Sequence, residues 1–278
     1  MNGIEKIHKA NLEILKEFDR ICQKNHIRYY IDAGTLLGAV RHRDFIPWDD
    51  DIDIILRRED YTRLREILPG ELMDGYVFAD ITDYNGHFFD FVPRVVLMNS
   101  QRRNPTEEDA FYAHMQNKIV LDIFIMDCAP KSRFARKMTV LGHKMIYGLA
   151  MGHRYKIDYA KHTTVNKVMI AVLSTIGRFI PLKKIFVWHH KFSIACKNRD
   201  SEYVMMSNFI LPYMNKEFKR EWYHETQKLT IRDYEFPVPG CWDQVLKVFY
   251  GDYMKLPPES ERICQHIKED EVVIGTTE

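Results

Sequence analysis

The chain has 278 residues, of which 46% are hydrophobic and 13% aromatic, so it carries ample apolar side chains for a packed core. Its five cysteines are odd in number, far apart and without a C-x-x-C pair, which argues against a disulfide framework or a zinc–thiolate site and fits a reducing compartment. The net charge of +1 hides an uneven distribution along the chain.

The first residues of the chain, Met1–Lys6, contain no apolar signal region, and we therefore expect a cytoplasmic protein. Apolar residues over 4–22 recur at helical spacing and predict an amphipathic helix. Residues 27–31 are rich in aromatic and branched side chains, which predicts a strand. A turn at Gly34-Thr35 then leads into a short helix that we expect over 36–42.

Four residues around this short helix are suited to binding phosphate. Gly34 lets the backbone approach a phosphate without a Cβ in the way, and Thr35 can donate its hydroxyl. The N-terminus of the following helix favours anions. Arg41 and His42, at the other end of the helix, could bind phosphates or stabilise a leaving group. The alternative is that this basic pair only interacts favourably with the negative end of the helix dipole.

A cluster of carboxylates leads into the next predicted strand, over 51–56. Residues two apart in a strand share one face, so Asp51, Asp53 and the preceding Asp49 point the same way, while the isoleucines between them enter the core. Parallel carboxylates repel each other unless a cation lies between them. Such hard oxygen ligands suit Mg²⁺ or Mn²⁺, ions that usually act on phosphates. The alternative, an acidic turn before an ordinary strand, leaves Asp53 unexplained.

The chain continues with a predicted helix over 59–68, strands over 76–81 and 87–97, a polar loop over 102–109 and a strand over 119–126. We expect Pro69-Gly70 to close the helix. Asp122 interrupts the last strand, whose other residues are strongly apolar. A two-metal phosphoryl-transfer site needs a third carboxylate from a neighbouring strand, and Asp122 supplies one. The alternative for Asp122 is a buried ion pair with a residue such as Arg94.

Residues 131–199 form a basic segment. Fifteen Lys and Arg stand against a single acid, Asp158, so the segment carries +14 and the rest of the chain −13. Its pattern is mostly helical, with breaks at Gly152 and Pro181. Such an asymmetry indicates an anionic partner, whether lipid headgroups, a polyphosphate-linked acceptor or the nucleotide; the alternative is a solvated helical face. We expect no nucleic acid as a partner of this segment, because its apolar helical pattern indicates that the helices pack in the protein.

The most apolar stretch of the basic segment, residues 165–180, is interrupted by charged residues and is too short to span a bilayer. It is more typical of a core helix, although a peripheral contact with a membrane surface stays open. After it, the last 70 residues are predicted to mix short strands and loops. There, Trp242, Tyr250, Asp252 and Tyr253 either cover the site and hold a donor, whose quaternary ammonium would favour aromatic faces, or simply pack a late turn.

The combination of these motifs resembles the nucleotidyltransferase superfamily, and more narrowly the LicD family. The resemblance rests on the string from Gly34 to His42, on Ile46–Asp53, on Val120–Phe124 and on Tyr250–Met254 with the following prolines. The LicD family includes bacterial phosphocholine transferases and is related to fukutin and fukutin-related protein. The chain departs from the family pattern at two places: at residues 231–233, where an aromatic-Glu-Gly run is common, and before Asp127, where Ile125-Met126 stands in place of the common Pro-Leu.

The resemblance implies an α+β fold, with a nucleotidyltransferase-like mixed sheet flanked by helices and a helix-rich basic C-terminal part. We expect a catalytic core over 1–130 and, over 131–278, helical and C-terminal elements that complete the active site, with one continuous domain as the alternative. The implied metal ligands, for Mg²⁺ or Mn²⁺, are Asp51, Asp53 and Asp122. These three aspartates are also the expected catalytic residues.

The resemblance also implies the reaction. A CDP-linked alcohol, with CDP-choline first, gives its phospho-alcohol to a sugar hydroxyl of a cell-surface glycan or teichoic acid precursor, and CMP leaves. The glycan is expected on a lipid carrier, with the enzyme at the inner face of the membrane through residues 131–199. The expected donor-binding residues are Gly34, Thr35, Arg41, His42, Asp49, Arg94, Tyr250, Asp252 and Tyr253. The alternatives are a nucleotidyltransferase that releases pyrophosphate and a non-catalytic glycan-binding protein on the same scaffold.

Overall fold

The computed structural model describes residues 3–161, 163–196, 201–209, 213–264, 267 and 269–275. Its helices are α1 (Gly3–Lys24), α2 (Ala33–His42), α3 (Arg58–Glu71), α4 (Glu107–Phe111), α5 (Arg133–Ala150), α6 (Thr164–Gly177), α7 (Leu182–Ser193) and α8 (Trp242–Tyr250). Its strands are β1 (Tyr29–Ile31), β2 (Ile52–Arg57), β3 (Tyr76–Ala79), β4 (Arg94–Leu97), β5 (Ser100–Gln101), β6 (Ile119–Cys128), β7 (Tyr203–Met206), β8 (Phe218–Lys219), β9 (Thr226–Ile231), β10 (Tyr234–Pro239) and β11 (Val273–Ile274).

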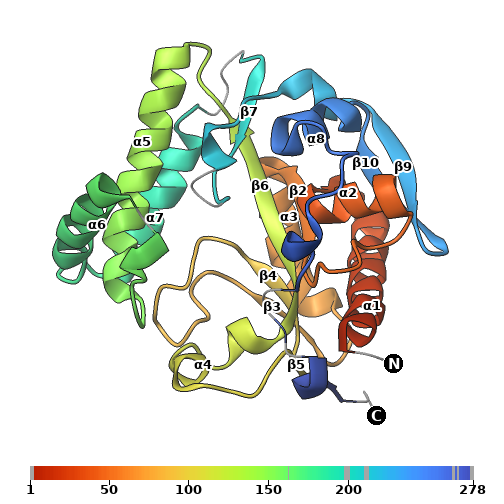
Figure 1. Ribbon diagram of the computed structural model, residues 1–278. Coiled ribbons are helices and arrows are strands. Elements are labelled where there is room, and N and C mark those ends of the chain that lie inside the picture. Colours follow the sequence, from red (N-terminus) through yellow and green to blue (C-terminus); the bar gives the residue numbers. More distant parts are fainter. Residues whose placement is uncertain are drawn as a thin grey trace.

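The main sheet is mixed and has the strand order β1-β2-β6-β4-β3, with β7 also paired to β6 and β8 to β7. Strands β2 and β6 run parallel, whereas the other pairings in this sheet are antiparallel. Figure 1 shows β6 running through the centre of the molecule, with α1, α2 and α8 on one side and α5 to α7 on the other. The α+β class with a mixed sheet flanked by helices is therefore confirmed.

The apolar face of α1 explains why this helix packs on the sheet. Ile7, Ile14, Leu15 and Phe18 lie at helical spacing and are fully buried in the largest core cluster, as the sequence pattern predicts. The same cluster contains residues from β2 and β6 and from the C-terminal hairpin β9–β10. Side chains from both sides of residue 130 thus share one core, while the division of the chain at that residue stays a prediction.

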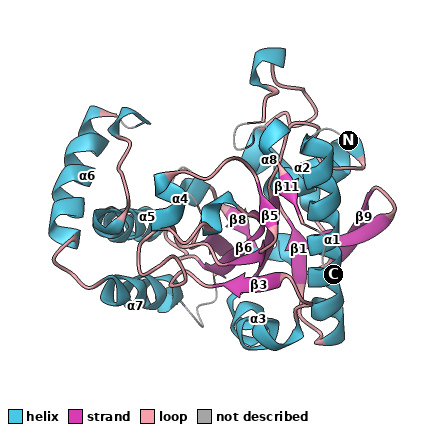
Figure 2. Ribbon diagram, turned by 90° about the horizontal axis from the view of Figure 1, so that it is seen from below, coloured by secondary structure: helices cyan, strands magenta, loops and turns pink. Residues whose placement is uncertain are grey.

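The basic segment forms a separate helical layer. Helices α5, α6 and α7 gather on one side of the sheet in Figure 2, and they enclose their own apolar cluster. Phe88 and Phe91, from the loop before β4, are buried in that cluster. No helix among the described residues is long and apolar enough to cross a bilayer.

Two of the predicted strand and helix boundaries are wrong near the first motif. Helix α2 begins at Ala33, so Gly34 and Thr35 lie in its first turn and not in a turn before it. The reason is that Asp32, in extended conformation, already accepts the first helical bond from the N–H of Leu36, at 3.0 Å. Helix α3 runs through Pro69 to Glu71: the proline removes one helical bond, and the N–H of Leu72 beyond it still donates to the carbonyl oxygen of Leu68 at 3.2 Å.

Three other expectations are corrected. The strand predicted over 87–97 is limited to 94–97, since the preceding residues turn their rings into the helical layer. The loop over 102–109 contains the start of α4, which Thr106 and Asp109 open with a reciprocal capping box. The C-terminal part contains helix α8, whose buried Val245, Leu246 and Phe249 follow helical spacing.

The departure at residues 231–233 has a structural role. Arg232 and Asp233 form the two-residue turn of the β9–β10 hairpin, with Arg232 at a positive φ of 57°. The Arg232 guanidinium pairs with Asp44 at 2.9 Å and with Glu5 at 2.9 Å. This hairpin therefore holds the loop after α2 against the start of α1.

His143 gives the helical layer a pH-dependent stability. It is 1% exposed and neither ring nitrogen has a hydrogen-bond partner among the described residues. Burial, helped by the charge of Arg58, lowers the pKa of His143 to about 4. In the unfolded chain His143 takes up a proton below its ordinary pKa of about 6.5, whereas in the folded chain it stays neutral. The free energy of unfolding therefore falls as the pH drops from about 6.5 towards 4.

We expect His143→Leu to remove this loss. Between pH 7.5 and pH 5 the variant should lose about 2 kcal/mol less stability than the wild type, from 1.36 kcal/mol for each pKa unit crossed. Urea unfolding at the two pH values measures the difference. Equal losses in the variant and the wild type would show that His143 is not the titrating group.

Candidate active site

The register of three strands aligns the central charged residues of the site. Asp53 on β2 lies opposite Asp122 on β6 in the parallel pairing, and Arg94 on β4 lies opposite Asp122 in the antiparallel pairing. Residues that face each other across neighbouring strands project to the same side of a sheet. The fold therefore brings these three side chains together in a row.

The acidic loop before β2 adds a second group of carboxylates. Among the described residues, Asp49, Asp50 and Asp51 are the one set of three whose candidate ligand atoms all lie within 4.8 Å of one another. Helix α1 anchors this loop: His8 Nε2 bonds to the carbonyl oxygen of Asp49 at 2.8 Å, and Asn11 Nδ2 donates to that of Asp50 at 3.1 Å. The sequence pattern gave no reason to single out His8 or Asn11, because both lie within an amphipathic helix.

The first turn of α2 fits against these carboxylates. A Cβ at Gly34 would collide with the carboxylate of Asp49 and lie 3.8 Å from Asp53 Oδ2, so only glycine allows this close approach. The Thr35 hydroxyl, 2% exposed, accepts a hydrogen bond from the backbone N–H of Asp53 at 2.9 Å. In this structure both residues hold the carboxylates in place, whatever their part in binding phosphate.

The carboxylates repel one another strongly. Burial raises the pKa of Asp53 well above its ordinary value, and the charges of Asp122, Asp51 and Asp49 raise it further. Burial likewise raises the pKa of Asp122 to about 6, although the nearby Arg94 opposes the rise. A cation between these groups would remove both causes of repulsion, and oxygen ligands of this kind suit Mg²⁺ or Mn²⁺.

Two buried arginines partly neutralise the site. Arg94 Nε lies 2.7 Å from Asp122 Oδ1, and its Nη2 lies 2.7 Å from Asp90. The ion pair between Arg94 and Asp122, considered from the sequence as an alternative to a metal, is thus present. Arg102 Nη1 lies 3.0 Å from Asp51 and 3.4 Å from Asp50. Arg102 stands in a polar stretch without periodicity, so nothing in the sequence pointed to it.

A cavity of about 460 Å³ opens on one side of the acidic loop. Its charged lining consists of three acids and three arginines, namely Asp51, Asp90, Asp122, Arg94, Arg102 and Arg103. Phe89 and Val120 add apolar surface, and Gln116 and Asn117 add amide groups. The arginines make this cavity suited to a phosphate group that sits beside the carboxylates.

A second cavity, of about 550 Å³, opens on the other side of the loop. Its walls carry aromatic rings from distant parts of the chain and several acids, namely Trp48, Tyr213, Tyr250, Tyr253, Asp49, Asp50, Asp252 and Glu261. Gly34, Arg41 and Lys255 also line it. Because Asp51 lines the first cavity and its neighbours Asp49 and Asp50 the second, the acidic loop forms the wall between the two.

Arg41 fastens the C-terminal part of the chain over this second cavity. Its Nη1 donates to the carbonyl oxygen of Tyr253 at 3.2 Å, its Nε donates to His42 Nε2 at 3.0 Å, and its guanidinium lies 5.9 Å from the centroid of the Trp48 ring. Tyr250, at the end of α8, is 38% exposed, and burial of its hydroxyl together with the charges of Asp53 and Asp49 raises its pKa well above the ordinary value.

The residues predicted for the site are therefore distributed over one connected region. Asp51, Arg94 and Asp122 line the first cavity, and Gly34, Arg41, Asp49, Tyr250, Asp252 and Tyr253 line the second. Asp53 and Thr35 lie beneath them, joined by a hydrogen bond. Trp242 is not among the lining residues, and its indole donates to Gln227 on β9. Asp127 is also outside the site, since it forms a bidentate pair with Arg58.

Asp32 is a further acid beneath the site that the sequence did not single out. It is fully buried, and its carboxylate oxygens have no hydrogen-bond partner among the described residues. Burial raises the pKa of Asp32 to about 7. Its backbone N–H donates to the carbonyl oxygen of Asp53 at 2.9 Å, which ties the start of α2 to β2.

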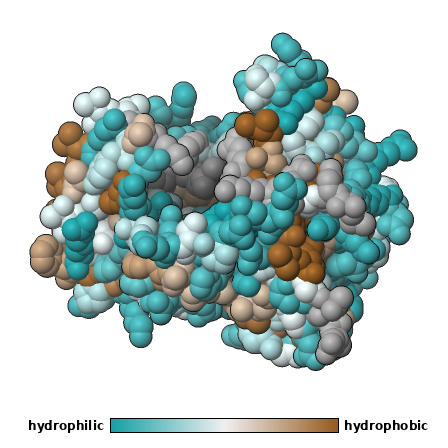
Figure 3. All heavy atoms as spheres, turned by 60° about the horizontal axis from the view of Figure 1, so that its bottom comes forward, coloured by the Kyte–Doolittle hydropathy of each residue, from teal (hydrophilic) through white to brown (hydrophobic). Residues whose placement is uncertain are grey.

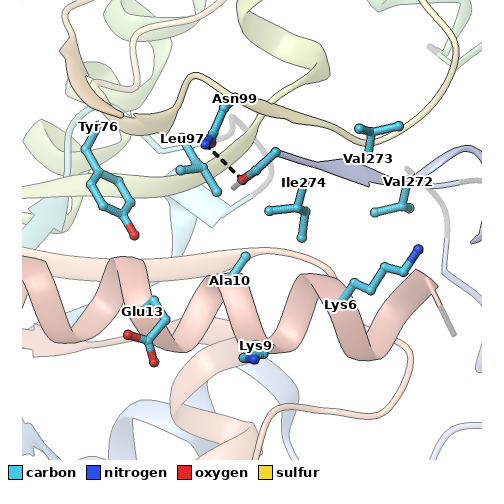
Figure 4. A pocket seen from close by; sticks show the side chains of 11 residues that line it. Lys6, Lys9, Ala10, Glu13, Tyr76, Leu97, Asn99, Val272, Val273 and Ile274 are labelled. Carbon is cyan, nitrogen blue, oxygen red and sulfur yellow. Dashed lines mark hydrogen bonds between the residues drawn. The ribbon is translucent and has the colours of Figure 1, made fainter. Parts of the chain in front are cut away.

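A third cavity, of about 650 Å³, lies between α1 and β11 and contains none of the predicted site residues (Figure 4). Its walls are mainly apolar, from residues such as Ala10, Leu97 and Ile274, with Lys6 and Glu13 at α1. Asn99 Nδ2 donates to the carbonyl oxygen of Gly275 at 2.9 Å, which holds the C-terminal strand in place. The chemistry is concentrated around the acidic loop instead.

Comparison with known proteins identifies similar chains. Residues 26–145, which include the acidic loop and Asp122, match the family described as LicD/FKTN/FKRP, nucleotidyltransferase domain. The lipopolysaccharide cholinephosphotransferase LicD of Haemophilus influenzae is 27% identical over 270 residues, which cover 93% of this chain and 94% of that protein. The ribitol 5-phosphate transferases FKRP of human and mouse are 39% identical over 66 residues, which cover 23% of this chain and only 13% of each transferase.

Proposed function

We propose that this chain, which is similar to the LicD family, is a phosphotransferase that transfers phosphocholine from CDP-choline to a sugar hydroxyl of a glycan and releases CMP. The observation that carries the choice of donor is the cavity of about 550 Å³ beside the acidic loop. Similarity to the family alone leaves the alcohol open, since relatives carry the names of both choline-phosphate and ribitol-phosphate transferases.

The lining of this cavity suits a quaternary ammonium group. Such a group is attracted to the faces of aromatic rings, and four rings line the cavity. A quaternary ammonium group also gains from nearby negative charge, which Asp252 and Glu261 supply in the lining of the cavity. A neutral polyol such as ribitol would need hydrogen-bonding groups more than aromatic faces.

The donor diphosphate would then lie over the acidic loop, with the cytidine phosphate towards the other cavity. Arg102 and Arg103 line that cavity and can donate to phosphate oxygens. The Phe89 ring also lines that cavity, stacked on Tyr84 with the Arg94 guanidinium 5.2 Å from its centroid. In this arrangement the scissile bond lies beside the carboxylates, between the two cavities.

A divalent metal fits the carboxylates at this position. The candidate ligand atoms of Asp49, Asp50 and Asp51 lie within 4.8 Å of one another, and Asp53 and Asp122 lie opposite each other on β2 and β6. We propose that Asp51, Asp53 and Asp122 hold Mg²⁺, or Mn²⁺, with Asp49 as a further ligand. When bound, the metal would neutralise the charge of the diphosphate and of the leaving group.

The reaction itself is an in-line displacement. An oxygen of the acceptor sugar attacks the phosphorus that bears choline, a new P–O bond forms, and the bond to the CMP oxygen breaks. Asp122 or a neighbouring carboxylate of the cluster takes the proton of the attacking hydroxyl. Arg102 stabilises the negative charge that builds up on the departing CMP.

Ligand-dependent thermal unfolding tests the donor. CDP-choline, CDP-ribitol, CDP-glycerol and CTP would each be added with Mg²⁺ and with EDTA, since a ligand that binds only the folded state raises its stability, and a tighter ligand raises it more. A metal-dependent rise in the unfolding temperature with CDP-choline, together with release of CMP from an acceptor mixture, is the expected result. Stabilisation by CTP alone with release of pyrophosphate would instead identify a nucleotidyltransferase.

Removal of one aromatic ring tests the choline cavity directly. Tyr250→Leu should weaken the binding of CDP-choline about tenfold or more, because a desolvated cation–π contact contributes up to about 2 kcal/mol. CMP, which lacks the ammonium group, should bind to the variant nearly as well as to the wild type. Trp242→Leu is a matched control, since Trp242 lies on the same helix but does not line the cavity. If Tyr250→Leu lost the same affinity for CDP-choline as for CMP, choline would not bind in this cavity.

A further inference from the structure

Helix α5 exposes a stripe of large apolar side chains. Phe134, Met138, Leu141 and Met145 follow spacings of four, three and four residues, so they lie on one face of the helix. Their exposed fractions range from 42% for Leu141 to 74% for Phe134. The opposite face of the helix carries the buried Val140 and His143, so the stripe is not needed for the core of the helical layer.

Helix α6 carries a second stripe of the same kind. Val168, Val172, Ile176 and Phe179, the last just beyond the end of the helix, are 63%, 53%, 50% and 85% exposed. Isolated apolar residues on a surface are ordinary, but eight large ones in two regular rows are not.

The two stripes lie on the same side of the helical layer. The α5 stripe continues at Gly148 and Leu149, three and four residues after Met145, and there α6 covers it. A Cβ at Gly148 would meet Leu173 of α6, and one at Gly177 of α6 would meet the backbone of Leu149. Helix α6 thus rests on the C-terminal part of the α5 stripe and turns its own stripe outward. Figure 3 shows the resulting hydrophobic atoms, interspersed with hydrophilic ones, over α6 at the left of the molecule.

The charged residues of the helices that carry these stripes are all positive, and one of them, Arg136, pairs with Glu217. Helices α5, α6 and α7 contain no acidic residue, and the segment 131–199 has fifteen Lys and Arg against one acid. Exposed examples beside the stripes are Lys137 on α5 and Arg178 next to Phe179. We call the two stripes and their flanking cations the α5–α6 surface.

We propose that the α5–α6 surface docks on the surface of an anionic lipid bilayer. Helices that lie in a membrane interface combine an apolar face with Lys and Arg at its edges, and they gain both from the burial of apolar area and from attraction to anionic headgroups. A protein partner fits less well, because lysine is depleted in protein–protein interfaces. Eight exposed apolar side chains also differ from a nucleic-acid surface, which is polar and basic.

The fold connects this surface with the active site. Arg154, just after α5, donates to the carbonyl oxygen of Phe89, and Phe88 is buried in the core of the helical layer. Phe89 and Asp90 line the cavity that contains Asp122. Docking would therefore anchor at the bilayer a layer that contributes to the active site, on the surface where an acceptor glycan on a lipid would be presented; this consequence, unlike the docking itself, rests on the proposed function.

Sedimentation with lipid vesicles tests the proposal. The full chain would be mixed with vesicles of phosphatidylcholine alone or with about 30% phosphatidylglycerol, a fraction typical of anionic surfaces, without donor or acceptor. We expect binding to the anionic vesicles that weakens as salt is raised. Phe134→Ser combined with Phe179→Ser should lower the partition coefficient about tenfold or more, through the loss of two buried rings. Lys137→Gln combined with Arg178→Gln should lower it only on anionic vesicles.

Met73→Ser combined with Val77→Ser is the matched control, because these residues are 52% and 43% exposed but lie outside the helical layer. This control should bind vesicles as the wild type does, and the phenylalanine variant should keep the wild-type unfolding temperature. The proposal would be overturned by equal vesicle binding of the phenylalanine variant and the wild type. It would also be overturned if the wild type did not bind vesicles and was a dimer, while the phenylalanine variant was a monomer. The surface would then hold a second copy of the chain. Neither result depends on the donor or on turnover.

Discussion

Asp53→Asn is expected to lower turnover by on the order of 10³-fold or more, the loss that follows removal of a central electrostatic stabiliser. Asp53 lies between the carboxylates of the acidic loop and Asp122, and the hydrogen bond from its own N–H to Thr35 fixes its position. The neutral amide keeps the shape of the side chain but removes the charge that a divalent ion and the diphosphate would require. Asp51→Asn is expected to act in the same direction.

The stability of Asp53→Asn shows whether a loss of turnover comes from the loss of metal binding or from unfolding of the protein. Burial and the charges of Asp122 and Asp51 hold the pKa of Asp53 well above its ordinary value, so the ionised side chain destabilises the metal-free protein. In EDTA, Asp53→Asn should therefore unfold at a temperature equal to or higher than the wild type at pH 8. In Mg²⁺ the wild type should gain stability and the variant much less. Asp44→Asn, whose carboxylate pairs with Arg232, is the control and should keep its turnover. Turnover near the wild-type value in both Asp51→Asn and Asp53→Asn would refute the metal assignment.

The sequence allowed the centre of the site to be predicted because its chemistry and its local geometry coincide. Asp53 and Asp122 each stand in a strand of otherwise apolar residues, and the alternation of a strand fixes which side chains share a face. What the alternation could not reveal is the pairing of the strands. The parallel register that places Asp53 opposite Asp122 depends on long-range contacts between β2 and β6.

The parts of the site that escaped prediction come from irregular segments. Arg102 lies between β5 and α4, and Tyr213 lies in a short turn, so neither is marked by a helical or strand pattern. The strand predicted over 87–97 failed for a related reason. Its alternating aromatic residues match a strand, but Phe88 and Phe91 find a better place in the core of the helical layer, more than 50 residues away along the chain from α6 and α7. Tertiary packing decides such segments, and local pattern does not.

The boundary of α2 is an instructive case, because the correction changes the role of two residues. A turn at Gly34-Thr35 would leave the Thr35 hydroxyl open to a ligand. Within the first turn of α2, that hydroxyl instead accepts a bond from Asp53, and Gly34 makes room for Asp49. The glycine and the threonine thus act on the carboxylates, and through them on whatever the carboxylates bind.

Arg94→Met is expected to destabilise the protein by about 3–5 kcal/mol, the cost of leaving buried partners of an ion pair without their counter-charge. Arg94 is 6% exposed and pairs with Asp90 and Asp122, both at 2.7 Å, while its Nη1 donates to the Tyr84 hydroxyl at 2.9 Å. Urea unfolding in EDTA at pH 7.5 measures the loss. Arg65→Met, which breaks the exposed pair with Asp80, should cost at most about 1 kcal/mol.

The same variant distinguishes the two roles considered for Asp122. Without Arg94, the pKa of Asp122 should rise above its value of about 6. The deficit of the variant, which is its loss of unfolding free energy relative to the wild type, should therefore shrink as the pH falls and the carboxyl takes up a proton. If Asp122 also binds a metal, Mg²⁺ should stabilise Arg94→Met at pH 7.5 by more than it stabilises the wild type, because the ion then replaces the counter-charge that Arg94 supplied to that carboxylate. If the ion pair is its whole role, Mg²⁺ should leave the deficit unchanged, and Asp122→Asn combined with Arg94→Met should recover stability with no loss of turnover beyond that of Arg94→Met alone.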